Sequence, residues 1–447
     1  MYRKTTIIII LAAGFALLLF FRPWEKKPKL PPRMEDRLPV ADIIGQSDLL
    51  ELAEAFSSTM FYYKLPFRDY LSPDFLLRQG KQYGADIQKP VFFFANETKG
   101  QVEDWGVLLP IKDSSKIREG INWLKKLNPI KDTIVHNVHV HFSPKYNMYT
   151  SYGDNWLLFY CGTHFENKLG TVVYAKRNEV KPKWRSFFNQ ENLEKSPIVG
   201  HLYSDLLKKY GIEYAALSLT NDSSSMILNA QIVQYDSLSF QLKPTGGILE
   251  KQEFTRNLIN LHFNIEQLRK RPEDPLYKVL KSFGAKVSFP VDELLEAWEG
   301  DLAFRQGGFH TIKEKYIEFV LDDNFNVAEV EKYQDVKVSG FSLYLSVNEN
   351  GASFLRKLFN KGIINKNEQK YRILYSPPVN LNQTDTSIVF HTGKYIPQLV
   401  QDSTNSILWT VNYAPIEFYI DSTSVRSVFG RIRVPLKKIV EDYVGDY

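Results

Sequence analysis

The sequence predicts an α+β fold with two diverged tandem copies of a largely antiparallel strand and helix unit, preceded by one transmembrane helix. Three observations lead to this prediction. Short sequence blocks recur in the same order in both halves of the chain. Each half mixes strand-like runs with a few helical segments, without the regular alternation of a doubly wound parallel sheet. An uncharged apolar run lies near the amino terminus.

The apolar run at residues 5–21 reads TTIIIILAAGFALLLFF and is just long enough to cross a bilayer as a helix. No small-residue cleavage site follows it, so an uncleaved signal anchor over residues 1–24 is favoured over a cleaved signal peptide. A short basic tip at Arg3 and Lys4 precedes the run, which favours a cytoplasmic amino terminus and an exported body. We therefore predict a single-pass protein of the bacterial inner membrane with a periplasmic body.

Charge and cysteine content restrict the class of protein. The net charge of +5 is accounted for by residues 1–29, so the rest of the 447-residue chain is neutral. A neutral body lacks the basic surface of a nucleic-acid binder, and no nucleic-acid partner is expected. The single cysteine, Cys161, excludes an intrachain disulfide, which suits the cytosol and the periplasm equally.

The internal repeat rests on blocks that match in order and spacing. Residues 154–162 and 385–393 share the pattern Asp, two variable residues, two aliphatic residues, Phe, two variable residues and Gly. Two further pairs lie upstream: VHVHFSP at 138–144 with YRILYSP at 371–377, and WGVLLPI at 105–111 with FSLYLSV at 341–347. A helical segment follows each member of the last pair. Because several blocks agree in order, we interpret the body as a duplication.

The repeat predicts the organisation of the chain. The expected parts are an anchor at 1–24, a Pro- and Lys-rich extended stalk at 25–37, copy one at 38–235, a joint at 236–257, copy two at 258–435 and a C-terminal helical tail at 436–447. Within the copies, ADIIGQSDLLELAEAF and LHFNIEQLRK each predict a strand leading into a helix, and PVFFFAN and DLAFRQG each predict the next strand. Each copy should end in a strand pair, around polar turns at 221–223 and 421–423.

The most suggestive group for chemistry is the histidine cluster in IVHNVHVHF. In a strand, His139 and His141 share a face about 6 to 7 Å apart, a spacing that can place two imidazoles on zinc, while His136 faces the other way. The matching positions of copy two are Arg372 and Leu374, and no further ligand stands at a recognisable spacing. A polar strand face is the simpler interpretation, and a pH-sensitive contact is a third. We predict no cofactor and no metal, with His139 and His141 as the only place to look for one.

Other candidate groups have structural interpretations. The acidic segment 290–301 could supply paired carboxylates, but Leu294, Leu295 and Trp298 form one helical stripe that leaves the acids on the solvated side. The Gly307-Gly308 pair indicates a turn or bulge, and the run around Cys161 predicts a core strand. The sequence contains no nucleophile elbow, zinc-protease motif, phosphate loop or dinucleotide-binding motif.

Three features together resemble bacterial families of unknown function in which a membrane anchor precedes an internally duplicated exported domain. They are the opening LPVADIIGQSDLLELAEAF, the segment GDLAFRQGG and the repeated Asp-to-Gly block. The resemblance implies an envelope location and a duplicated α+β fold. It implies no catalytic residues.

The sequence therefore favours a membrane-anchored, non-catalytic binding or scaffold protein of the cell envelope, with an envelope protein as its partner and an unknown ligand. One alternative is a metal-dependent envelope hydrolase that uses the His139 and His141 strand. Another is a lipid or small-molecule carrier, which predicts a large apolar pocket. The groove between the two copies is the expected place for a ligand or partner.

Overall fold

The computed structural model describes residues 31–62, 72–99, 101–177, 184, 187, 196, 198–222, 224–321, 327–367, 370–374, 376–393, 395–411 and 414–436. The predicted anchor at 1–24, most of the predicted stalk and the tail beyond Leu436 lie outside these residues. Within the described ranges, no helix is both long and apolar enough to cross a membrane.

The first half is an antiparallel sheet centred on β1, which pairs with β2 on one side and β8 on the other. From β2 the sheet continues through β3 and β7 to β6, β5 and β4, and from β8 it continues to β9 and β10. The strands are β1 (Ile43–Ser47), β2 (Val91–Thr98), β3 (Gln101–Pro110), β4 (Lys131–Val135), β5 (Val138–Ser143), β6 (Met148–Tyr152), β7 (Trp156–Cys161), β8 (Ile198–Leu202), β9 (Ile212–Asn221) and β10 (Ser225–Gln234).

The second half repeats this pairing order around β13, which pairs with β14 and β21. From β14 the order continues through β15 and β19 to β18, and from β21 to β22 and β23. A separate hairpin of β16 and β17 is linked to the start of β18 by a bridge at Tyr371 and Val379. The strands are β13 (Thr255–Asn264), β14 (Trp298–Leu321), β15 (Val327–Val347), β16 (Ile364–Asn367), β17 (Lys370–Ile373), β18 (Asn380–Gln383), β19 (Ser387–His391), β21 (Asn405–Val411), β22 (Ala414–Thr423) and β23 (Ser427–Pro435).

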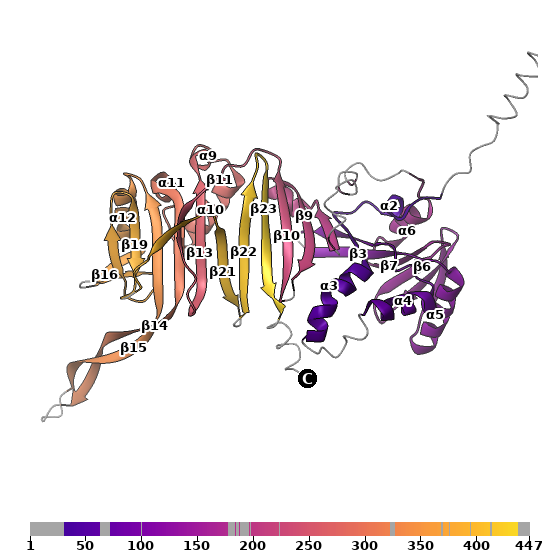
Figure 1. Ribbon diagram of the computed structural model, residues 1–447, viewed down its shortest axis with the longest axis horizontal. Coiled ribbons are helices and arrows are strands. Elements are labelled where there is room, and N and C mark those ends of the chain that lie inside the picture. Colours follow the sequence, from indigo (N-terminus) through magenta and orange to yellow (C-terminus); the bar gives the residue numbers. More distant parts are fainter. Residues whose placement is uncertain are drawn as a thin grey trace, which may run out of the picture.

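The two halves join through their last strands. β10 and β23 pair antiparallel from Ser225 with Pro435 to Val233 with Ser427, so one continuous sheet runs through the molecule. Figure 1 shows this sheet extending from the edge near β16 past β3 to the region of β6. The predicted α+β class, with mostly antiparallel sheet, is confirmed.

Helices cover the sheet and begin where their capping residues predict. Asp113 accepts hydrogen bonds from the amides of Ser115 and Lys116 at the start of α5, and Asp274 accepts one from Leu276 at the start of α10. The helices are α2 (Met34–Arg37), α3 (Leu49–Tyr62), α4 (Pro73–Tyr83), α5 (Ser114–Leu127), α6 (Phe165–Val173), α8 (Asp205–Lys209), α9 (Glu266–Arg269), α10 (Pro275–Lys286), α11 (Val291–Ala297) and α12 (Gly351–Asn360). As the sequence predicts, α5 follows β3 and α12 follows β15.

Two predicted boundaries are wrong. Residues 34–37 form α2 instead of ending the extended stalk, because Arg37 is buried and its Nη1 donates a 2.6 Å hydrogen bond to the carbonyl oxygen of Val172. The last polar turn lies at residues 424–426, since β22 continues to Thr423 and Ser424 bonds across to Ser427.

Residues 236–257, the predicted joint, include β11 (Gln241–Leu242), which pairs with β13, and β12 (Gly246–Leu249), which pairs with β20 (Leu399–Asp402).

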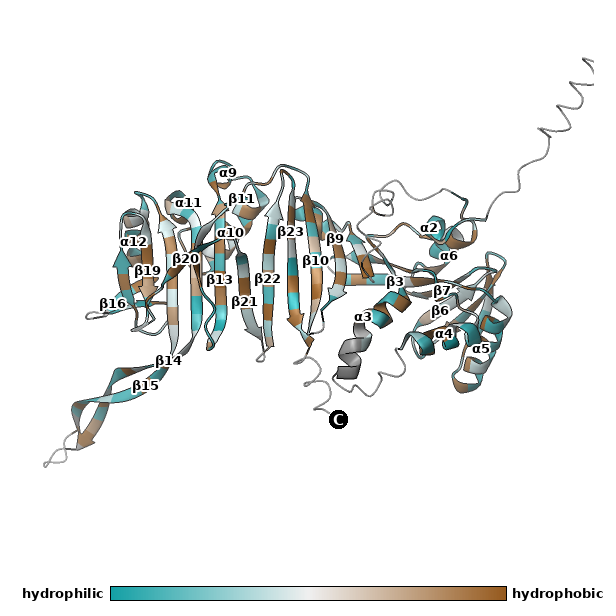
Figure 2. Cartoon of the chain, in the orientation of Figure 1, coloured by the Kyte–Doolittle hydropathy of each residue, from teal (hydrophilic) through white to brown (hydrophobic). Residues whose placement is uncertain are grey.

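One feature of the second half has no counterpart among the described residues of the first half. β14 and β15 extend beyond the sheet as a long two-stranded arm, visible at the lower left of Figure 1. Its base contains the predicted bulge at Gly307 and Gly308, where the pairing register shifts. Figure 2 shows hydrophobic residues along the arm, and Phe319 and Val327 are 65% and 67% exposed.

Candidate functional site

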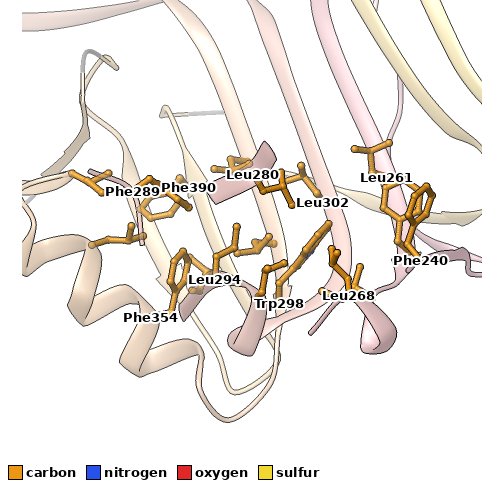
Figure 3. A pocket seen from close by; sticks show the side chains of 18 of the residues that line it. Phe240, Leu261, Leu268, Leu280, Phe289, Leu294, Trp298, Leu302, Phe354 and Phe390 are labelled. Atoms are coloured by element: carbon orange, nitrogen blue, oxygen red, sulfur yellow. The ribbon is translucent and has the colours of Figure 1, made fainter. Parts of the chain in front are cut away.

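The second half contains an apolar cavity of about 600 Å³. All 23 residues that line it are Leu, Ile, Phe or Trp. Figure 3 shows their side chains pointing into one space between the helices and the sheet. We call this space the apolar cavity.

The sheet forms one wall of the apolar cavity. Leu343 and Leu345 alternate along β15 and therefore point to the same face, and Ile388 and Phe390 do so on the neighbouring β19. Leu302 of β14 extends this wall. The period-two pattern of these strands thus places their large apolar side chains inside the cavity.

Helices form the opposite wall. Leu276 and Leu280 are one helical turn apart on α10, Leu294 lies on α11, and Phe354 and Leu358 lie on α12. The outer face of α10 is also apolar, because Val279 and Phe283 are 43% and 69% exposed. The stripe of Leu294, Leu295 and Trp298, read from the sequence as helix packing, lines this cavity.

Charged groups stay at the surface of this helical layer. Asp292 pairs with Lys281 at 2.8 Å, and this ion pair together with the Tyr277 hydroxyl lowers the pKa of the Asp292 carboxyl. Glu299 pairs with Arg269 at 3.0 Å. The contacts of Asp292 support the prediction of a solvated acidic face on α11, whereas the prediction that the helix continues through Trp298 and Glu299 is wrong, because α11 ends at Ala297 and β14 begins at Trp298. Neither Asp292 nor Glu299 lines the cavity.

The corresponding face of the first half is arranged differently. Leu157 and Phe159 of β7 occupy the pairing positions of Ile388 and Phe390. There, Ile117 and Ile121 of α5 pack with Leu157 in a small buried cluster. The same sheet face is thus closed by direct contact in one half and left hollow in the other.

His139 and His141 lie two residues apart on β5, as the sequence predicts, whereas His136 lies outside the strand. His136 and Asn137 have φ of 53° and 62° and form the two-residue turn between β4 and β5, so the expectation that His136 lies in the strand is wrong. His139 is exposed, whereas His141 is buried and its Nδ1 lies 2.8 Å from Oδ1 of Asp132, directly across the hairpin. Within the described residues, no group of three or more His, Cys, Asp or Glu side chains is arranged to hold a metal.

Cys161 lies at the end of β7 and is partly buried, and burial raises the pKa of its thiol. A raised pKa reduces the thiolate fraction and so makes the thiol a poor nucleophile.

The buried carboxylate of Asp104 has two polar neighbours, an arrangement that the sequence pattern does not predict. Its Oδ1 accepts a 2.6 Å hydrogen bond from Asn96, and its Oδ2 lies 3.4 Å from Nδ1 of His164. Burial and the nearby Asp104 carboxylate raise the pKa of the Tyr160 hydroxyl.

Comparisons with known proteins identify no family. No protein-family model and no curated protein sequence matches this chain. Among solved structures, the chain is similar to crystal forms III and IV of TP0453, each at 10% identity over 46% of this chain and 81% of that chain, with TM-scores of 0.30 and 0.31. Crystal form I of TP0453 matches at 9% identity over 48% of this chain and 82% of that chain, with a TM-score of 0.30. Similarity at this level carries no argument about fold or function.

Proposed function

We propose that this protein binds an apolar ligand, such as an acyl chain, in the apolar cavity, and that it acts as a membrane-anchored carrier. The observation that supports the proposal is the cavity's lining of 23 hydrophobic residues around about 600 Å³. Sites for small molecules usually measure roughly 300–1,000 Å³. A site without polar groups selects a ligand, or a part of one, that offers hydrocarbon only.

Energetics support an occupied cavity. Void volume in a protein core costs about 24 cal/mol per Å³. The apolar cavity opens partly to solvent, and its 23 apolar side chains lack van der Waals contacts on the side that faces the unfilled space, which carries a cost of the same kind. Water does not relieve this cost, because an apolar lining offers it no hydrogen bonds. An apolar ligand removes the cost by contacting the walls.

We also propose that the two halves arose as diverged copies of one unit. The matching sequence blocks fall on corresponding strands, with residues 105–111 and 341–347 on or just beyond β3 and β15. Residues 154–162 and 385–393 contain β7 and β19. The shared pairing order is the supporting observation. The signal anchor and periplasmic body are part of the same proposal and place the cavity close to a source of lipid.

Photolabelling tests the carrier function with the full-length chain in its native membranes. A fatty acid bearing a diazirine is added, the membranes are irradiated, and labelled peptides are identified by mass spectrometry. We expect label on cavity-lining peptides of β15 and α11. Label on residues 5–21 serves as an internal reference for contact with the bulk bilayer.

Two neighbouring substitutions on α10 make the test specific. Leu280→Trp fills the cavity, whereas Val279→Trp places the same ring on the exposed side of the same helix. Labelling of the cavity peptides should fall several-fold in the first variant and stay unchanged in the second. Absence of cavity labelling in the wild-type chain, or an equal loss in both variants, would contradict the carrier function.

The other functions predicted from the sequence receive less support. His139 and His141 differ in exposure, and His141 is engaged by Asp132, so the geometry gives no reason to propose a metal-dependent hydrolase. An envelope protein partner stays a prediction from the sequence.

A further inference from the structure

Arg305 is a buried cation that forms no ion pair within the described part of the chain. Its residue is 8% exposed, and its Nη1 donates one hydrogen bond of 3.2 Å to the carbonyl oxygen of Glu250. Burial lowers the pKa of its guanidinium, and no carboxylate acts on that pKa. None of its nitrogens is fully enclosed without a partner, so the N–H groups that do not bond to Glu250 open on an adjoining hollow and are available to a ligand.

The guanidinium lines a hollow of about 230 Å³, which we call the Arg305 pocket. Its other walls include the aromatic side chains of Phe254 and Tyr395 and the side chains of Gln252 and Gln398. Arg305 is three residues from Leu302 on β14, so the two side chains point to opposite faces of the sheet. The Arg305 pocket is therefore separate from the apolar cavity.

The glycine bulge shapes this pocket. Gly308 has φ of 68°, and a Cβ placed there would lie 2.6 Å from Oη of Tyr395 and 2.9 Å from Cδ2 of Phe254. Only glycine allows both rings to approach β14 this closely. The rings of Phe254 and Tyr395 pack edge to face at 5.9 Å, and Tyr395 donates a 3.0 Å hydrogen bond to the carbonyl oxygen of Phe309. The walls beside Arg305 are thus held in place.

The first half shows that the fold does not require a cation here. Phe94 occupies the corresponding position, opposite Gly106 of β3, as Arg305 lies opposite Ser342 of β15. Phe94 is 1% exposed and belongs to the main core of its half. An apolar side chain satisfies this position structurally, so the arginine in the second half points to binding.

We propose that the Arg305 pocket binds a small anion that presents two oxygens to the guanidinium, as a carboxylate or phosphate group does. The planar fork of arginine donates two parallel hydrogen bonds to such a group. Glu250 lines the same pocket and forms no ion pair with Arg305, so its exposed carboxylate weakens the binding of an anion there by charge repulsion. The pocket therefore discriminates by charge and shape and does not depend on the carrier function.

Thermal unfolding of the full-length chain in detergent tests this site. Sodium phosphate and sodium acetate are the probes, with sodium chloride at matched ionic strength as the reference. We expect a saturable rise in Tm with phosphate, acetate or both, and the two probes distinguish a phosphate group from a carboxylate. No saturable rise with either probe overturns the proposal.

Three variants give the test its specificity. Arg305→Met should abolish the anion-dependent rise, whereas the control Arg118→Met, in the exposed part of α5, should retain it. Glu250→Gln should tighten anion binding by roughly fivefold, because it removes repulsion of about 1 kcal/mol. This variant keeps the arginine and so tests the site even where Arg305→Met does not fold. Anion affinity that is unchanged or weaker in Glu250→Gln contradicts the proposal.

Discussion

The two halves share one order of strand pairing but use the helix-covered face of the sheet differently. In the first half, Ile117 and Ile121 of α5 pack directly on Leu157. In the second half, α10, α11 and α12 surround about 600 Å³ of apolar space. The comparison teaches that strand pairing sets the wall of a possible site, whereas the helices inserted between the strands decide whether the space is filled.

The opposite face differs in a second way. In the first half it carries the main core, which includes Phe94, Leu158 and Tyr160. In the second half, the position of Phe94 is taken by Arg305 beside a polar pocket. The second half therefore contains both candidate binding sites. The following predictions test this contrast in order of decreasing effect.

The largest effect is expected from truncation of the first-half core. Leu158 is fully buried, so Leu158→Ala should lower the free energy of unfolding by about 2–5 kcal/mol. Leu343→Ala, in the wall of the apolar cavity, should lower the free energy of unfolding by less than Leu158→Ala does, because the Leu343 side chain lacks packing contacts on the side that faces the cavity. Urea denaturation followed by circular dichroism measures both. Equal losses would show that the second half is packed as tightly as the first.

A smaller loss is expected at the β4–β5 turn. Asn137 has φ of 62°, a conformation that β-branched residues strongly disfavour. Asn137→Val should therefore destabilise the protein by about 1–2 kcal/mol, and the control Asn137→Gly should not. The readout is Tm under identical conditions. If Asn137→Gly lowers Tm as much as Asn137→Val, the left-handed backbone at this position is not the cause of the destabilisation.

The third prediction concerns pH. Hydrogen bonds from Lys125 and His141 lower the pKa of the Asp132 carboxyl below its ordinary value of 3.8. The ionised form is thus favoured in the folded state, so its stabilising effect is complete above that value and is lost as pH falls through the lowered pKa. Asp132 is half exposed, which limits the effect to less than about 1 kcal/mol. Asp132→Asn should flatten the acid end of the plot of Tm against pH, and an unaltered plot would rule out this contact as its source.

The smallest effect is expected from the arm that only the second half possesses. Its outer ion pairs, Lys315 with Glu331 and Lys332 with Glu318, lie within the arm itself. Replacing residues 316–332 by Asn-Gly should therefore change the free energy of unfolding by less than about 0.5 kcal/mol. A loss comparable with that of Leu158→Ala would mean that the arm stabilises the body of the protein.

Parts of the fold could be predicted from the chain because their signals are local. The repeated aromatic-Ser-Pro and Asp-to-Gly blocks mark the ends and starts of strands, and β5, β7, β17 and β19 lie on them. The turn at His136 and Asn137 was missed, since these residues continue an alternating pattern and only their positive φ values reveal the reversal. Residues 34–37 were missed because the burial of Arg37 depends on Val172, far along the chain.

The candidate sites were less accessible to prediction. Polar and titratable residues such as His139 suggest a functional site in a sequence. The residues that line a cavity, in contrast, have the same types and spacing as the residues of a packed hydrophobic core. Leu294 and Trp298 were recognised as an apolar stripe, and nothing in their spacing says whether the opposite wall touches them. Arg305 stands out only when its burial is known.

The sequence by itself determined the strand and helix periodicity, the repeated blocks and the neutral charge of the body, because each depends on residue type and on neighbours along the chain. The tertiary structure alone decided which apolar faces meet, which leave a hollow, and which charged side chain is buried without an acidic partner. These depend on how residues far apart in sequence are arranged, such as Leu280 and Leu343 on opposite walls of the apolar cavity, or Arg305 with the carbonyl oxygen of Glu250. Packing volume and desolvation exist only once such distant surfaces are brought together.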